Sequence, residues 1–269
     1  MSAVAEQSRG RQVLVTGGAQ RLGALLCTAF AQAGWAVWCH YQRSQDAAQQ
    51  LVDLLCADGL RAQAVQADLS SESERQQMMA HIARHSGGLH CLVNNASTFE
   101  EDAAAELDLD LVRLQMEVNL LAPLSLSACM AQSLPADAEP GACSIVHLLD
   151  QKVFNLNPDY FSYTVSKLAL ERAVALQAQA LAPRIRVCGV APGLMFLSGP
   201  QTQANFDKAA QVNLMQTALD PMQVARACVF LAENPCVTGT TLCVDNGQHL
   251  VPLARDVMFA VQDNLASPL

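Results

Sequence analysis

The chain has 269 residues, of which 51% are hydrophobic and 15% charged. This composition supplies a full globular core and excludes a disordered protein. A formal charge of -9, with no run of lysine or arginine, argues against sequence-independent nucleic-acid binding, which depends on a basic face. No segment approaches the ~18 continuous apolar residues of a membrane span, and the polar N-terminus has no apolar export signal. We expect a small-molecule partner, and neither export nor membrane insertion.

Ten cysteines are scattered along the chain without a CxxC pair. Several, such as Cys39 and Cys243, lie inside apolar runs, where a free thiol behaves as a small buried hydrophobe. This usage fits a reducing compartment and predicts a cytoplasmic protein.

Short apolar runs alternate with segments of helical period from Val13 onward, a pattern typical of βαβ units around a parallel sheet. Strands are predicted over 12–16, 35–41, 61–67, 89–93, 143–149, 184–191 and 241–244. Helices are predicted over 22–33, 45–58, 71–84, 106–132, 160–181 and 221–232. The predicted fold class is α/β: a single-domain, Rossmann-like, doubly wound parallel sheet of seven strands with helices on both faces.

No linker rich in Pro, Ser or Gly interrupts this series. One domain is therefore expected over 12–250, and its least regular stretch, 194–220, is a candidate substrate loop or lid. Residues 1–11 are expected to form a flexible segment and 251–269 a tail.

The segment from Thr16 to Gly23 follows the first predicted strand and opens the first helix, so the helix N-terminus faces whatever binds above it. Gly17 allows a sharp turn, and Gly23 allows close packing of helix on sheet. An ordinary tight turn is the alternative. The strand, turn and helix context favours a pyrophosphate, with Arg21 and Leu22 also at the cofactor.

The end of the second predicted strand has no carboxylate to accept the ribose 2'-hydroxyl of NAD. Arg43 and Ser44, with Arg21, can instead bind a 2'-phosphate, which favours NADPH. The alternative is that Arg43 is a solvated loop charge. The cofactor positions expected around this end are His40, Tyr41, Arg43, Ser44 and, after the third strand, Asp68 and Leu69 at the adenine.

Tyr163 and Lys167 place a phenol and an ammonium one helical turn apart. The cation is expected to lower the pKa of the phenol, which prepares it to pass a proton near neutrality. Alone this spacing is a weak signal of catalysis, because Tyr and Lys four residues apart often just lie along the surface of a helix without a chemical role.

These motifs resemble the short-chain dehydrogenase/reductase family over residues 13 to about 248. The matching residues are Gly17, Arg21, Gly23, Asp68, Leu69, Asn94, Asn95, Ala96, Asn119, Tyr163, Lys167, Pro192, Gly193 and the run 244–247. The resemblance implies that Tyr163 is the proton donor, that Lys167 binds the nicotinamide ribose and tunes Tyr163, and that Asn119 holds a water in a proton relay. It places Asn95, Ala96, Pro192 and Gly193 at the cofactor.

Asp150 stands where that family usually has a serine. A carboxyl suits a nitrogen heterocycle, because reduction of a C=N bond needs a proton on nitrogen beside a hydride on carbon. Asp150, the run from Asn94 to Phe99, Arg21 and the pair His40-Tyr41 resemble the pteridine reductase branch of the family. That branch implies that Phe99 covers the substrate opposite nicotinamide and that Arg21 and Ser97 also face it; a core or lid role for Phe99 is the alternative.

Two further residues are interpreted as core. Cys188 lies in a predicted buried strand without an activating base, and His147 lies in another apolar strand. No zinc-ligand spacing is present, so no metal is expected.

The sequence therefore predicts an NADPH-dependent reductase of pteridines, such as dihydromonapterin, dihydrobiopterin or dihydrofolate. A reductase of ketones or 3-oxoacyl thioesters is the alternative on the same fold, and a non-catalytic cofactor-binding protein is a third. The helix over 160–181 is rich in Leu and Ala on more than one face and is expected to pack against its counterpart in a homotetramer.

Overall fold

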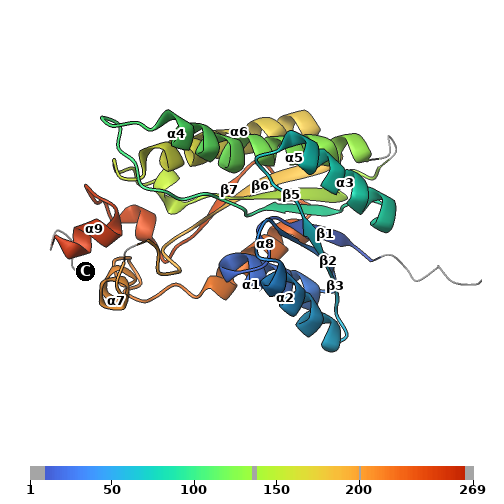
Figure 1. Ribbon diagram of the computed structural model, residues 1–269, viewed down its shortest axis with the longest axis horizontal. Helices are drawn as coiled ribbons and strands as arrows, with labels where there is room; N and C mark the ends of the chain where they lie inside the picture. Colours follow the sequence, from blue (N-terminus) through green and yellow to red (C-terminus); the bar gives the residue numbers. More distant parts are fainter. Residues whose placement is uncertain (1–9, 135–137, 200, 264–269) are drawn as a thin grey trace, which may run out of the picture.

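The computed structural model describes residues 10–134, 138–199 and 201–263 (Figure 1). Most of the expected flexible segment 1–11, and the last six residues of the expected tail, lie outside the described residues. Within the described residues, no helix combines the length and apolarity needed to cross a bilayer.

Seven parallel strands form one sheet in the order β3-β2-β1-β4-β5-β6-β7, which confirms the predicted sheet. The strands are β1 (Gln12–Val15), β2 (Ala36–Tyr41), β3 (Arg61–Gln66), β4 (Cys91–Asn94), β5 (Cys143–Leu148), β6 (Ile185–Pro192) and β7 (Thr241–Val244). Strand order reverses between β1 and β4, and the crevice of such a sheet opens at this switch point, beyond the carboxyl ends of the strands.

Helices cover both faces of the sheet (Figure 1). One layer contains α1 (Arg21–Gln32), α2 (Gln45–Ala57) and α8 (Pro221–Glu233). The other contains α3 (Glu72–Ser86), α4 (Leu109–Met116), α5 (Ala122–Ser133) and α6 (Phe161–Leu181). The expected helix over 106–132 is divided, because a π-helical turn, η1 (Glu117–Leu121), joins α4 to α5.

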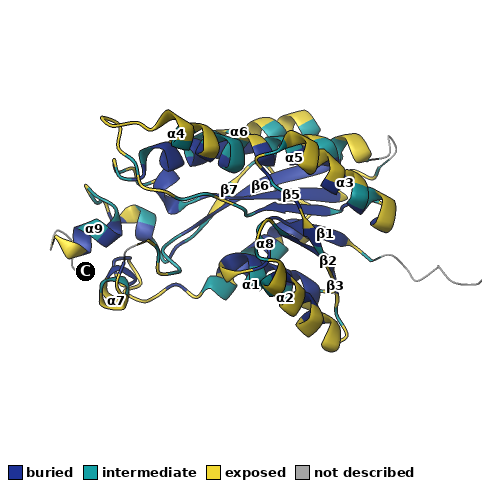
Figure 2. Ribbon diagram, viewed as in Figure 1, coloured by how far each residue is buried: buried dark blue, intermediate teal, exposed yellow. Residues whose placement is uncertain are grey.

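The alternation of strand side chains divides the core between the two layers. Val13 and Val15 of β1 pack toward α1 and α8, whereas Leu14 packs toward the opposite face with Leu126 of α5. Figure 2 shows the strands buried and the outer faces of the helices exposed. Both faces are covered, so the open edge at the carboxyl ends is left for the site.

Two short helices lie beyond the periodic pattern. α7 (Gln203–Ala209) lies inside the irregular stretch 194–220, and α9 (Val257–Gln262) follows the last strand. The two helices share a small apolar cluster that includes Ala209 and Val261. They flank the carboxyl-end side of the sheet (Figure 1). Single-turn 3-10 segments occur at η2 (Gln151–Val153) and η3 (Gln248–Leu250).

Candidate active site

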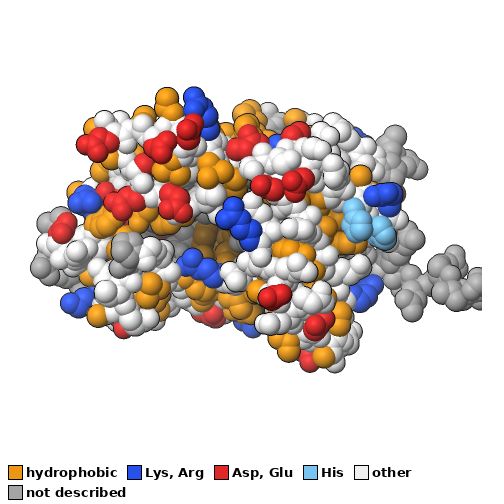
Figure 3. Space-filling model, in the orientation of Figure 1, with side chains coloured by type: hydrophobic (Ala, Val, Ile, Leu, Met, Phe, Trp, Pro, Cys, Tyr) orange, Lys and Arg blue, Asp and Glu red, His pale blue; other side chains and the backbone are white. Residues whose placement is uncertain are grey.

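A cavity of about 690 Å³ opens at the carboxyl ends of the strands. Figure 3 shows it as a hollow with hydrophobic side chains in its depth and Lys or Arg side chains at its edge. Its lining begins at the glycine turn before α1 and includes the loops after β4 and β5. It ends at Asp256, just before α9, and at Val257, the first residue of α9. A volume of this size suits a cofactor together with a small substrate.

The glycine turn is held by His40, which is 2% exposed. Its Nδ1 accepts a hydrogen bond from the Gly17 amide at 2.9 Å, so Nε2 carries the proton and donates to the Ala67 carbonyl at 3.0 Å. Burial lowers the pKa of His40 to about 4. The neutral imidazole therefore links the glycine turn to the end of β3, and the Gly17 amide is not available to a ligand.

The N-terminus of α1 supplies the anion-binding donors instead. The first amides of the helix, at Arg21, Leu22 and Gly23, have no carbonyl to bind within the helix, and all three residues line the cavity. A side chain at Gly23 would place its Cβ 1.9 Å from the Gly17 carbonyl oxygen, so only glycine allows this close approach. The donor set and the cavity volume fit a dinucleotide.

Arg43 and Asp68 lie at the same end of the cavity. Asp68 accepts hydrogen bonds from the Ser70 amide and hydroxyl, and these bonds, with the nearby Arg43 charge, hold the pKa of Asp68 below its usual range. Arg43 is exposed toward solvent. Arg43 follows β2 and Asp68 follows the edge strand β3, so this end of the cavity lies at the β2–β3 side of the sheet.

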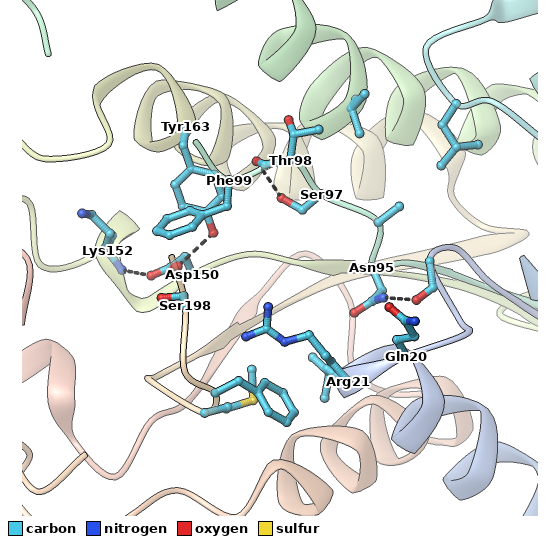
Figure 4. Close-up of a pocket in the computed structure, with 18 of the residues that line it drawn as sticks. Gln20, Arg21, Asn95, Ser97, Thr98, Phe99, Asp150, Lys152, Tyr163 and Ser198 are labelled. Atoms are coloured by element: carbon cyan, nitrogen blue, oxygen red, sulfur yellow. Dashed lines mark hydrogen bonds between the residues drawn. The ribbon is translucent and has the colours of Figure 1, made fainter. Parts of the chain in front are cut away.

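Asp150 and Tyr163 form a hydrogen-bonded pair in the cavity (Figure 4). The Tyr163 hydroxyl donates to Asp150 Oδ2 at 2.9 Å, and Asp150 Oδ1 accepts the Lys152 amide at 2.8 Å. Burial raises the pKa of Asp150 above its ordinary value despite the nearby Lys152 charge. The carboxyl thus keeps a proton to a higher pH than a solvated aspartate does, as a proton source requires.

Lys167 is 3% exposed, and its Nζ donates to the Leu148 carbonyl at 2.8 Å. It lies 5.7 Å from the centre of the Tyr163 ring, and burial lowers its pKa to about 8. The pKa of Tyr163 is nevertheless raised, opposite to the expected direction, because the phenol is buried and faces the Asp150 carboxyl. The Lys167 cation alone would lower the pKa of Tyr163, but the hydrogen-bonded Asp150 carboxyl and burial outweigh it.

Asn119 lies in the π-helical turn and is 1% exposed. Its Oδ1 accepts from the Thr98 amide and the Ser97 hydroxyl, and its Nδ2 donates to the Thr98 carbonyl and the Ser166 hydroxyl. The side chain therefore has protein partners at each of these groups. It holds the loop after β4 against α6.

Phe99 lines the cavity beside Tyr163. Its ring stacks on Tyr160 at 4.0 Å between centres and meets Tyr163 edge-on at 4.7 Å. Tyr160 stacks in turn on Phe259 of α9 at 6.1 Å. This aromatic column holds the Phe99 ring in place at the Tyr163 end of the cavity.

Arg21 bridges the glycine turn and the loop after β6. Its Nη2 donates to the Leu197 carbonyl at 2.8 Å, and the guanidinium lies 5.1 Å from the Phe196 ring centre. Figure 4 shows it across the cavity from Tyr163 and Asp150. The residue is thus placed between the two ends of the cavity.

The structure brings most of the predicted positions together, but not all. The predicted residues that line the cavity are Gly17, Arg21, Leu22, Gly23, His40, Arg43, Asp68, Leu69, Asn95, Ala96, Ser97, Phe99, Asp150, Tyr163 and Gly193. Those outside its lining are Tyr41, Ser44, Asn119, Lys167 and Pro192. Tyr41 packs against the core under α1 and α2, and Ser44 lies at the N-cap of α2.

Several lining residues carry no motif in the sequence. They include Leu114, Val118, Lys152, Gln248, Asp256 and Val257. The sequence offered one signal for Lys152: lysine is rare in this chain, with three in all, and this one lies two residues after the candidate catalytic Asp150. Asp256 had none, because only the tertiary fold brings it to the site.

Both residues interpreted as core are confirmed there. Cys188 is 2% exposed, and burial raises its pKa, which leaves it a protonated thiol. His147 is fully buried between Asn94 and Gln177, at 3.2 and 2.8 Å. Among the residues that the structure describes, no cluster of His, Cys, Asp and Glu could hold a metal ion.

A family model described as enoyl-(acyl carrier protein) reductase matches residues 17–249. The chain belongs to the short-chain dehydrogenase/reductase family. Two relatives are dihydromonapterin reductases. That of Citrobacter koseri is 27% identical over 238 residues, which cover 88% of this chain and 96% of the relative. That of Klebsiella pneumoniae is 27% identical over 250 residues, which cover 92% and 100%.

Solved structures agree with this placement. FolM alternative dihydrofolate reductase 1 from Brucella canis, complexed with NADP, matches with a TM-score of 0.85 and 36% identity over 91% of this chain and 96% of that chain. The angucycline C-6 ketoreductase LanV with bound NADP matches with a TM-score of 0.81 and 25% identity over 90% and 96%.

Proposed function

We propose that the protein is an NADPH-dependent reductase of pteridines, converting a dihydropterin to its tetrahydro form. The observation that carries the proposal is the Asp150–Tyr163 pair, joined at 2.9 Å in a cavity that also contains the glycine turn. The names of the dihydromonapterin reductases and of the Brucella protein support the same substrate class.

Reduction of the C=N bond adds a hydride to carbon and a proton to nitrogen. Bound NADPH supplies the hydride. The proton comes from the chain: Tyr163 and Asp150 share a hydrogen bond, and burial raises the pKa of the carboxyl, so the pair keeps a proton to a higher pH than a solvated aspartate does. Lys167 adds a positive charge beside the phenol, which stabilises it when it has given up its proton.

The cofactor is assigned to the half of the cavity nearest the glycine turn. The α1 amides of Leu22 and Gly23 bind its pyrophosphate, and Arg43 binds the 2'-phosphate that distinguishes NADPH from NADH. Asp68 and Leu69 contact the adenine. Phe99 and Arg21 flank the substrate half, with Ser97 beside them.

A reductase of ketones or 3-oxoacyl thioesters is the second candidate, favoured by the family model's description and by the likeness to a ketoreductase. Asp150 argues against it, because a carboxyl that has given up its proton repels the oxyanion that carbonyl reduction develops, whereas in C=N reduction the same carboxyl can pass its proton toward nitrogen. A serine at this position would stabilise that oxyanion instead.

Oxidation of NADPH, followed spectroscopically with a dihydropterin, a simple ketone and an oxoacyl thioester, tests the proposal. Asp150→Ser is expected to lower dihydropterin turnover by about 10²-fold or more, the scale of a lost general acid, while NADPH binding survives. Tyr163→Phe is the control that disables either reaction. Full dihydropterin turnover in Asp150→Ser, or wild-type activity on carbonyl substrates alone, would contradict the proposal.

The working form is proposed to be a cytoplasmic homotetramer. All ten cysteines are free thiols, which suits a reducing compartment. Exposed apolar side chains on α4 and α6, including Leu109 and Leu176, support association of copies.

The reductase domain is assigned to residues 12–250 with its substrate loop at 194–220. Asp256 and Val257 of the segment 251–269 line the same cavity.

A further inference from the structure

Lys152 is a buried ammonium at the substrate end of the cavity, and the mechanism above gives it no role. It is 2% exposed. Its Nζ donates to Asn157 Oδ1 at 2.8 Å, to the Asp159 carbonyl at 3.0 Å and to Asp256 Oδ2 at 3.1 Å. Three acceptors match the three protons of an ammonium, so this charge is committed to the protein rather than to a ligand.

The third acceptor belongs to a segment 104 residues away in sequence. Asp256 caps α9 through the Met258 amide, and its own amide donates to Asp159 Oδ2 at 2.6 Å. Arg255 reinforces the contact, since its Nε lies 3.0 and 2.9 Å from the two Asp159 carboxylate oxygens. Asp256 and the following Val257 line the cavity, so these bonds fix a part of its wall.

The same lysine is tied to Asp150. The Lys152 amide donates to Asp150 Oδ1 at 2.8 Å, and the two residues lie side by side in Figure 4. The titratable groups that act on Asp150 are Lys152 of η2, Tyr163 and Lys167 of α6, and Asp256 before α9. The Lys152 charge lowers the pKa of Asp150, and the Asp256 charge raises it.

We propose that Lys152 and Asp256 are positioning residues for the proposed pteridine reduction, on which this inference rests: the ion pair between the buried Lys152 ammonium and the partly exposed Asp256 carboxylate fixes Asp256 and Val257 as part of the substrate-side wall of the cavity, beside Asp150. Neither side chain contacts the reacting atoms. Each acts through Asp150 and through the shape of the wall. Because the two charges have opposite signs, removing them one at a time has opposite effects on Asp150.

The test compares Lys152→Met with Asp256→Asn. Matched controls are Arg84→Met and Asp53→Asn, which each remove one charge of the same sign at exposed positions of α3 and α2, away from the cavity lining. NMR of isotope-labelled aspartate carboxyls, with Asp150→Asn to assign the signal, follows the titration of Asp150. Its pKa is expected to rise by about half a pH unit or more in Lys152→Met and to fall by a similar amount in Asp256→Asn, with both controls unchanged.

Kinetics provide the second readout. In both variants the KM for a dihydropterin is expected to rise by about tenfold, while the Kd for NADPH changes by less than about twofold. Shifts of Asp150 in the same direction, or no shift, would overturn the inference.

Asp256→Asn keeps an oxygen acceptor for Lys152, so it carries the test alone if Lys152→Met fails to fold. A wild-type protein that leaves dihydropterins unreduced would overturn the proposed function, whereas the NMR titration would still decide the role of the ion pair.

Discussion

We expect cofactor choice to depend on Arg43, because it is the exposed cation just after β2, where a carboxylate would select NADH. A charge-assisted bond to the 2'-phosphate contributes about 1.5 to 3 kcal/mol. Arg43→Ala is therefore expected to weaken NADPH binding by about tenfold or more and to leave NADH binding unchanged, as measured by fluorescence titration.

Arg113→Ala is the matched control, since that arginine is exposed on α4 and pairs only with Asp110 among the residues that the structure describes. It is expected to leave both dissociation constants unchanged. Equal affinity of the wild type for NADPH and NADH would contradict the assignment of Arg43.

Phe99 is predicted to determine substrate binding without affecting the cofactor. Tyr160 stacks on the Phe99 ring and Tyr163 lies nearly perpendicular to it. Stacking of an aromatic ring on a flat heterocycle contributes about 1 kcal/mol beyond burial. Phe99→Ala is expected to raise the KM for a dihydropterin severalfold with an unchanged Kd for NADPH. Phe230→Ala, at an exposed position of α8, is the control, and an unchanged pterin KM in Phe99→Ala would assign the ring to the aromatic column alone.

At the scale of elements, the contact between the glycine turn and α1 is the tightest constraint on the cofactor site. In Gly23→Ala, the new Cβ would lie 1.9 Å from the Gly17 oxygen and 2.9 Å from Gly18 Cα, so the helix must move away from the turn. We expect loss of NADPH binding, measured by titration, and a lower Tm.

Gly10→Ala is the matched control for Gly23→Ala. Its new Cβ would meet only the flexible end of Arg61, which can move. Full NADPH affinity in Gly23→Ala would show that the turn adapts and that its glycine is not required.

The elements that the sequence predicts well are those whose periodicity the core enforces. β1 alternates Val13, Leu14 and Val15 between two apolar faces, and the predicted strand and the observed one differ by a single residue. α9 escaped prediction because six residues cover less than two helical turns, too few for a period to stand out.

The site likewise contains residues that the sequence identifies and residues that only the tertiary fold brings into place. Tyr163 and Asp150 were identifiable because each occupies a motif position, and the structure joins them by a hydrogen bond of 2.9 Å. Whether the pKa of Tyr163 is raised or lowered was not predictable, because it depends on how deeply the phenol is buried and how close it lies to the Asp150 carboxyl. The Lys152–Asp256 pair required the tertiary fold, because no local pattern links two residues 104 positions apart.

For the whole molecule, two buried neutral histidines make stability depend on pH. Burial lowers the pKa of both His40 and His147 to about 4, against about 6.5 in the unfolded chain. Between these values the unfolded chain binds more protons, so the free energy of unfolding falls as pH drops through this window, by about 3 kcal/mol for each histidine.

Urea unfolding at about pH 7 and about pH 4.5 measures this dependence. His147→Gln removes one of the two groups, so its free energy of unfolding is expected to fall less over the same range. An identical fall in the variant and the wild type would show that His147 is accessible to protons in the folded state.

The association of copies is the other whole-molecule prediction. Leu176 on the outer face of α6 is 65% exposed, and Leu54 on α2, in the opposite layer, is 67% exposed. If α6 packs against its counterpart, Leu176→Glu is expected to yield a smaller species by light scattering, whereas Leu54→Glu leaves the mass unchanged. A stable wild-type monomer at micromolar concentration would contradict the proposed tetramer.

The partner of Lys152 comes from a position beyond the last strand, and this has a consequence for synthesis on the ribosome. All seven strands and the glycine turn emerge before Asp256, whereas a buried ammonium without its carboxylate is costly. We therefore expect the nascent chain to assemble its sheet and glycine turn first, and the part of the cavity wall formed by Asp256 and Val257 to close only after this last segment has been released.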